Sequence, residues 1–335
     1  MWVMNTITLP TRSDALLSLL QGVKEHYIAP PPRPRKPGKP PEFSSLSFLL
    51  LAVVAVVTRS FSDSELHRLL RQDDDLLQAL DFCRLPHRTT IGRRLVTLLP
   101  HAEEQIQALG QVLAAEVQPG DHQSAVSAID GRMYEAQGPK WHQKDRQAER
   151  VPSRLRNVDC QSSWSKSGYR GWIQGYRLIV QGLVFPHPVP LWAAWRSNHD
   201  YEATVAWQAL AEQNLQVTDV LLGDTTFAQP DFRQAYQEAG GWVLTPKQLP
   251  RKRRSWKQDL YEYRKETQEL LFQRIIQASG VKACPVKGYG RNGAFVLATV
   301  WLYQICFLKD YRAQRPLACI KEHIERARWR LKLES

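Results

Sequence analysis

The stretch Ser124 to Arg132 reads SAVSAIDGR, an apolar run that ends on an aspartate followed by a glycine. Its small and β-branched residues predict a strand with Asp130 at the carboxyl end. The stretch Val217 to Asp224 (VTDVLLGD) repeats this pattern and ends on Asp224. Because ligands of open α/β sheets gather beyond the carboxyl ends of the strands, we expect the two aspartates to share one site.

The elements around these two strands predict the fold class. Further strands are expected at Gly171 to Phe185, Pro190 to Arg196 and Gly241 to Thr245, and helices at Tyr201 to Gln213, Gln229 to Ala239 and 266 to 278. Strands first, then strands alternating with helices, predict an α/β fold with a mixed sheet flanked by helices. One aspartate after a strand is usually a turn or cap residue, whereas two in one sheet favour a shared site.

A third acidic residue, Glu269, lies in the last of these helices. Leu271, Phe272, Ile275 and Ile276 form one apolar face, and Glu269 lies beside that face rather than opposite it. A helix that packs this face on the sheet would direct Glu269 towards the strand ends. Glu266, one turn earlier, is the alternative acid, and a solvated helix glutamate is the ordinary interpretation of either.

The part of the chain before residue 118 is expected to be all-helical. It opens with an amphipathic helix within 11 to 28, followed by PPPRPRKPGKPP at 30 to 41, which predicts an extended basic tether. The apolar run FLLLAVVAVV at 48 to 57 is shorter than the ~20 residues of a membrane span and predicts a buried helix. Ser62 and Glu65 predict a capping box for the next helix.

Basic residues follow in the outline of a helix-turn-helix. A short helix at 75 to 80, a break at Pro86 and a helix from about His87 suggest a DNA reader, although small helical bundles share this outline. The candidate DNA contacts in it are Arg88, Arg93 and Arg94.

The charge of the whole chain agrees with a polyanionic partner. Its 335 residues carry 45 Lys and Arg against 33 Asp and Glu, a formal net charge of +12. Such an excess of positive charge favours a polyanion such as DNA as the partner. Five cysteines without a Cys-x-x-Cys pair argue for a reducing compartment and against a structural zinc site. The first ten residues hold no Lys or Arg, so no signal peptide is indicated.

Several short motifs resemble, in order and spacing, those of the DDE-type transposases of bacterial insertion sequences. They are Ala128-Ile129-Asp130-Gly131, Trp164-Ser165-Lys166-Ser167, Gly171-Trp172, Gly175-Tyr176-Arg177, Ser197-Asn198-His199-Asp200, Leu221-Leu222-Gly223-Asp224 and Glu269-Leu270-Leu271-Phe272-Gln273-Arg274. Asp130 and Asp224 are 94 positions apart (224 − 130), and Glu269 follows Asp224 after 45 (269 − 224). The resemblance covers about Phe43 to Gln304 and implies a ribonuclease-H-like catalytic domain.

The resemblance also implies an activity. Asp130, Asp224 and Glu269 would hold two Mg²⁺ ions, for which Mn²⁺ could substitute, and DNA strands would be cut at transposon ends and joined to target DNA. The partners would be double-stranded DNA and a second copy of the chain, with no membrane, in the cytoplasm of a bacterium and at its nucleoid. The expected domains are a helix and basic Pro-rich linker (1–42), a helical DNA-binding region (43–118), the ribonuclease-H-like DDE domain (119–310) and a basic C-terminal helix (311–335).

The chain departs from the family pattern on the glutamate helix. Such enzymes often carry a Tyr, Arg, Glu, Lys series there, but Tyr261 and Arg264 place the acid at Gln268, one residue before Glu269. The lysine position that follows from Glu269 is Ile276. Two alternatives therefore stay open: a catalytically silent DNA-binding protein derived from a transposase, and a related structure-specific nuclease.

Basic residues interleaved with aromatic residues are the remaining candidates for DNA contact. Basic groups bind phosphates and aromatic faces stack on unpaired bases. In the sheet domain they are Lys140, Lys166, Trp172 and Arg177, and near the glutamate helix they are Arg251, Lys252, Arg253, Arg254 and Arg274.

Overall fold

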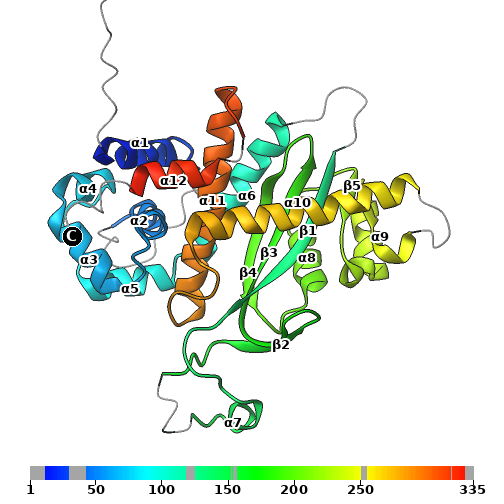
Figure 1. Cartoon of the computed structure of the whole chain (residues 1–335), viewed down its shortest axis with the longest axis horizontal. Helices are drawn as coiled ribbons and strands as arrows, with labels where there is room; N and C mark the ends of the chain where they lie inside the picture. Colours follow the sequence, from blue (N-terminus) through cyan, green and yellow to red (C-terminus); the bar gives the residue numbers. More distant parts are fainter. Residues whose placement is uncertain are drawn as a thin grey trace, which may run out of the picture.

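The structure is a computed structural model that describes residues 12–29, 43–117, 125–151, 153, 157–249, 255–317 and 319–328. The basic Pro-rich stretch and Arg251 to Arg254 lie outside these residues. A twisted sheet fills one half of the molecule and a group of helices the other, with one long helix, α10 (Trp256–Ser279), crossing the sheet (Figure 1). The expected α/β fold with a mixed sheet flanked by helices is confirmed.

The sheet joins an antiparallel set of strands to a parallel pair. Strands β1 (Val126–Glu135), β3 (Gly171–Phe185) and β4 (Val189–Ser197) form an antiparallel set with β3 in the middle. The short strands β5 (Val220–Leu222) and β6 (Trp242–Leu244) continue the sheet in parallel on the other side of β1. The resulting order, β4-β3-β1-β5-β6, makes β1 the strand where antiparallel and parallel pairing meet.

Alternating side chains direct the two faces of the sheet into different helical layers. Leu191, Ala193 and Trp195 of β4 pack with α6 (Leu99–Glu116) and α11 (Tyr289–Arg312), whereas Trp192 and Ala194 pack with the opposite layer. That layer consists of α8 (Glu202–Ala211) and α9 (Pro230–Glu238). The period of two along the strands therefore sets which helix lies on which side.

The N-terminal helices follow the predicted order. They are α1 (Arg12–Glu25), α2 (Ser45–Thr58), α3 (Asp63–Gln72), α4 (Asp74–Ala79) and α5 (Arg88–Val96). The capping box of Ser62 and Glu65 is present at the start of α3. Every residue from Phe48 to Val57 is fully buried, so this apolar run is the core helix that the sequence predicted.

One hydrophobic core joins the N-terminal helices to the sheet. Helix α11 contacts α2, α5, α6 and β4, and side chains from Leu20 to Ile324 belong to the same buried cluster. By length and composition α11 could cross a membrane, but 94% of its most apolar window is buried inside the protein. The last helix of the described chain, α12 (Ile320–Arg328), packs beside α1. The domain boundaries expected from the sequence stay predictions.

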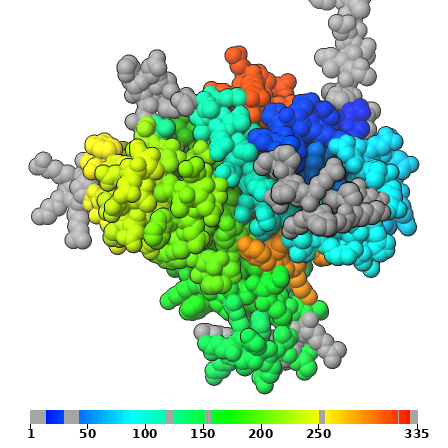
Figure 2. Space-filling view, turned by 180° about the vertical axis from the view of Figure 1, so that it is seen from behind, coloured from blue at the N-terminus to red at the C-terminus, as the bar shows by residue number. Residues whose placement is uncertain are grey.

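Three elements were not expected from the sequence. Strand β2 (Ser163–Ser167) pairs with the start of β3, and the short helix α7 (Gln143–Gln147) lies in a segment that projects from the body of the molecule (Figures 1 and 2). Helix α11 was not assigned either. Its apolar residues run around the whole helix, so they show no amphipathic period to detect.

Gly110 tests the contact between α6 and β4. A methyl group on Gly110 would overlap the backbone carbonyl of Leu191, which cannot move without disturbing the sheet. We expect Gly110→Ala to lower the free energy of unfolding by about 1–3 kcal/mol, measured by urea denaturation. Gly168→Ala, whose added methyl group would meet no atom within 4 Å, is the matched control. Equal stability of the two variants would contradict the close contact.

Candidate active site

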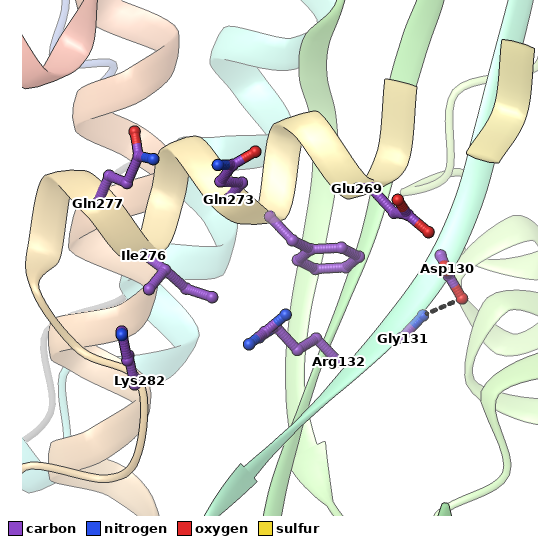
Figure 3. A pocket seen from close by; sticks show the side chains of 9 residues that line it. Asp130, Gly131, Arg132, Glu269, Gln273, Ile276, Gln277 and Lys282 are labelled. Carbon is purple, nitrogen blue, oxygen red and sulfur yellow. Dashed lines mark hydrogen bonds between the residues drawn. The ribbon is translucent and has the colours of Figure 1, made fainter. Parts of the chain in front are cut away.

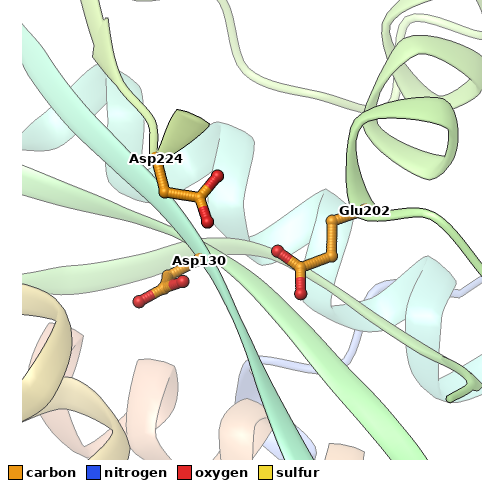
Figure 4. A group of neighbouring side chains, drawn as sticks. All are labelled: Asp130, Glu202 and Asp224. Atoms are coloured by element: carbon orange, nitrogen blue, oxygen red, sulfur yellow. The ribbon is translucent and has the colours of Figure 1, made fainter. Parts of the chain in front are cut away.

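Three carboxylates meet at the edge of the sheet: Asp130, Asp224 and Glu202 (Figure 4). One oxygen from each lies within 4.8 Å of the others, and among the described residues this is the group of acidic, histidine and cysteine side chains placed to share a metal ion. The expectation that Asp130 and Asp224 come together agrees with this geometry. Glu202 was not among the predicted residues.

The difference in length between β1 and β5 places the two aspartates. Strand β5 pairs with β1 only as far as Leu222 opposite Ala128, whereas β1 continues to Glu135. Asp130 therefore lies just beyond the point where its parallel neighbour ends. Asp224 follows that end and caps a short 3-10 helix, η2 (Thr225–Ala228), by accepting a hydrogen bond of 2.7 Å from the backbone N–H of Thr226.

Glu202 enters the cluster from the first turn of α8. The loop before it is held on the sheet, because the Asn198 side chain donates to the carbonyl of Ile173 (3.1 Å) and the His199 N–H donates to the Ser163 hydroxyl (3.0 Å). Gly131 provides the space for the carboxylate, since a methyl group there would overlap the Glu202 side chain. The glycine of the Asp130-Gly131 motif thus lets an acid from α8 lie against β1.

Two arginines partly balance the negative charge. Arg177 pairs with Glu202 at 2.7 Å, with both side chains about nine-tenths buried, and Arg264 of α10 pairs with Asp130 at 3.3 Å. The pKa of Glu202 is raised to about 7, mainly because the carboxyl group is buried; Arg177 opposes this shift, whereas the nearby Asp130 and Asp224 add to it. Burial also raises the pKa of Asp130, although Arg264 lowers it.

The donor set fits a divalent cation. Hard cations such as Mg²⁺ take carboxylate oxygens, keep several waters and need few protein ligands. Burial and the repulsion between neighbouring carboxylates both raise the pKa values of Glu202 and Asp130, and a divalent charge among the three carboxylates would relieve the repulsion. Asp130, Glu202 and Asp224 are the residues that could hold it.

Glu269 lies near this cluster but outside it. It lines a cavity of about 600 Å³ together with Asp130, Arg132 and Phe272, and Figure 3 shows Glu269 and Asp130 on the same side of that cavity. Its side chain is exposed, and the same cavity is bounded by Ile276 and Lys282. Glu266 is also exposed and does not line the cavity. The role of Glu269 as the third acid, and that of Glu266 as its alternative, stay predictions.

Gln268 occupies the position where the resemblance, counted from Tyr261 and Arg264, places an acid. It is buried, and its amide N–H donates to the carbonyl of Ala128, two residues before Asp130. A glutamate at this position would place a carboxylate oxygen against that carbonyl oxygen. An amide at 268 therefore fixes α10 to β1, and the neighbouring Glu269 takes the exposed position over the cavity.

The predicted DNA contacts fall into three groups. Arg88, Arg93, Lys140, Lys166 and Trp172 are exposed. Three arginines are turned into the protein instead: Arg94 lies over the Phe48 ring, Arg177 pairs with Glu202 and Arg274 donates to the Tyr303 hydroxyl. Arg251, Lys252, Arg253 and Arg254 lie outside the described residues. All of these contacts with DNA stay predictions.

No protein-family model matches the chain, and no curated protein matches it in sequence. Among solved structures, it is similar to a piggyBac transposase synaptic complex with hairpin DNA, at 9% identity and a TM-score of 0.42, over 97% of this chain and 80% of that one. It is also similar to the Mos1 strand transfer complex, at 14% identity and a TM-score of 0.27, over 89% of this chain and 79% of that one. A functional inference therefore depends on the side chains of the site.

Glu202→Gln tests the acid that the sequence did not predict. Because the substitution removes a carboxylate but keeps its shape, we expect Mn²⁺, titrated into the full chain and followed by electron paramagnetic resonance, to bind at least about tenfold more weakly. Glu238→Gln on the exposed side of α9 is the control. If Glu202→Gln binds Mn²⁺ as tightly as the unmodified chain, Glu202 is not a metal ligand. If Glu269→Gln weakens Mn²⁺ binding as much as Glu202→Gln does, Glu269 is a ligand too.

Gln268→Glu tests the register of α10. The buried carboxylate would face the Ala128 carbonyl, so we expect the free energy of unfolding to fall by about 1–3 kcal/mol in urea denaturation. Gln273→Glu, at an exposed position of the same helix, should change stability little. Undiminished stability combined with tighter Mn²⁺ binding would instead place position 268 among the metal ligands.

Proposed function

We propose that this protein is a transposase that binds DNA ends and uses divalent metal ions to cut and join DNA strands. The observation that carries the proposal is the cluster of Asp130, Glu202 and Asp224 at the strand ends of a ribonuclease-H-like sheet. The ordered transposase-like motifs of the sequence and the net charge of +12 support it.

In this proposal Asp130 and Asp224, which the resemblance implies as metal ligands, hold the cation together with Glu202 of α8. When bound, Mg²⁺ would activate a water or a 3′-hydroxyl and stabilise the leaving oxygen, with Mn²⁺ as a substitute. Arg264 and Arg177 hold Asp130 and Glu202 in place from opposite faces of the sheet. Glu269, on the exposed side of α10 beside Asp130, is the candidate for the additional acid of a two-metal site.

The assembly follows from the reaction. Joining two transposon ends to one target requires two active sites, so we propose a homodimer on double-stranded DNA. Insertion-sequence origin, a cytoplasmic location and association with the bacterial nucleoid are parts of the same proposal.

A structure-specific nuclease is the second candidate function. The observation that favours it is the origin of the third clustered acid, which comes from α8 rather than from the glutamate helix α10 that the family pattern specifies. Such an enzyme would cut without joining and without specific ends. Cleavage of duplexes taken from the DNA that flanks the gene, compared with cleavage of scrambled duplexes, distinguishes the two functions.

Asp224→Ala tests the proposed chemistry. With Mg²⁺ present, we expect cleavage of an end-bearing duplex to fall by roughly a thousandfold or more, because a metal ligand is lost. DNA binding, measured by gel shift in EDTA, should stay within a few-fold of the unmodified chain. Cleavage that persists in this variant, or in EDTA, would contradict the proposed metal-dependent chemistry. If the unmodified chain binds DNA in the gel shift but never nicks it, the protein is the catalytically silent DNA-binding protein.

A further inference from the structure

The tip of the β2–β3 hairpin carries two aromatic side chains that no part of the described chain covers. Tyr169 is 98% exposed and Trp172 is 64% exposed, the highest values among the large hydrophobic residues of the described chain. Methyl groups built on Gly168 and Gly171 would meet no atom within 4 Å, so the turn stands in open space. Figure 1 places β2 and the start of β3 at the end of the sheet remote from β5.

Exposed aromatic surface of this kind is unfavourable in water and is ordinarily used for binding. Single exposed apolar residues need no explanation, but here two aromatic rings lie within four residues of one turn. Neither residue packs into a cluster of the core, whereas the next residue along β3, Ile173, is buried. The two rings are therefore available to a partner.

The charge around the rings identifies the kind of partner. Lys166 is the cross-strand neighbour of Trp172, and Arg170 follows Tyr169; both are exposed. Arg170 forms a long ion pair of 3.8 Å with Glu135, which also pairs with Lys140, and no acidic residue occurs between Ser163 and Trp172. Cations beside uncovered aromatic faces form the combination that binds nucleic acid: the cations contact phosphates and the rings stack on bases.

Strand β3 connects this tip directly to the acidic cluster. Asp130 lies opposite Val180, which is eight residues after Trp172 on the same strand. At about 3.3 Å per residue, Trp172 is about 26 Å along the strand from the position opposite Asp130. At 3.4 Å per step, that distance corresponds to about eight base pairs of duplex.

We propose that the hairpin tip binds unpaired bases of DNA about eight base pairs from the point of cleavage. Tyr169 and Trp172 stack on the bases, while Lys166 and Arg170 contact the adjacent phosphates. In an intact duplex the base faces are stacked on one another, so this tip favours DNA that is opened or distorted at that distance from the cut. The distance between the unpaired bases and the cut rests on the proposed function, whereas the binding of unpaired bases by the hairpin tip does not.

The test measures binding without cleavage. The full chain in EDTA is titrated into two fluorescein-labelled duplexes of one sequence, one fully paired and one with an internal bubble of unpaired bases, and anisotropy is recorded. We expect tighter binding to the bubble duplex. Tyr169→Ala and Trp172→Ala should each weaken that binding about fivefold or more, with little effect on the paired duplex. Trp172→Phe should retain most of the affinity.

Trp207→Ala is the matched control, because Trp207 is an exposed tryptophan on α8, away from the hairpin. Lys166→Ala should reduce the slope of log affinity against log salt by about one. Equal affinity of the chain for both duplexes, or alanine variants that bind the bubble as well as the parent does, would overturn the proposal. A change from dimer to monomer in the tip variants, measured without DNA, would also overturn the proposal, because the tip would then be a surface for self-association.

Cleavage in Mg²⁺ separates this proposal from the proposed function. On a bubble duplex that also carries a transposon end, we expect the main cut about eight base pairs from the unpaired bases. If the unmodified chain cuts no DNA but the tip variants bind the bubble duplex more weakly, the proposed role of the tip is supported and the transposase proposal is contradicted. If the unmodified chain cuts DNA and the tip variants bind the bubble duplex as tightly as it does, the transposase proposal is supported and the proposed role of the tip is contradicted.

Discussion

Strand β1 is hydrogen-bonded along both edges, but on the β5 side only as far as Ala128. The rest of the site depends on this early end of the parallel pairing. It leaves Asp130 beside an unpaired strand edge, brings Asp224 to the same place and exposes the Ala128 carbonyl to Gln268 of α10. A longer β5 would pair with this edge of β1 through backbone hydrogen bonds, and the carboxylates could then not come together there.

The sequence predicted the elements whose signals are local. Alternating strand residues led to Asp130 and Asp224 at strand ends, and the apolar run at 48 to 57 led to a buried helix. Glu202 was missed because an acid in the first turn of a helix is ordinarily explained by the helix dipole. What distinguishes it is tertiary: the anchored Ser197-Asn198-His199-Asp200 loop, the space at Gly131 and the partner Arg177. The motif containing that loop was recognised, but the acid two residues after it was not.

The arginines show the same limit. A basic residue in a DNA-binding context suggests a phosphate contact, yet Arg94, Arg177 and Arg274 use their guanidinium groups inside the protein. Composition gives the sign of a charge, whereas only the fold determines whether it faces solvent. Strand β2 was missed for a related reason, because its serine-rich sequence has little intrinsic preference for a strand and its pairing with β3 comes from the hairpin.

The shared core built around α11 has a mechanical consequence. Because α11 packs at once on the N-terminal helices and on the β4 side of the sheet, the helical region cannot swing about a hinge relative to the carboxylates without opening buried apolar surface. In the proposed function, DNA bound by the helices would therefore stay at a set distance from the acids, and the DNA would have to adjust between its bound and cut positions. The DNA double helix would then bend to fit the protein, rather than the protein changing shape to fit the DNA.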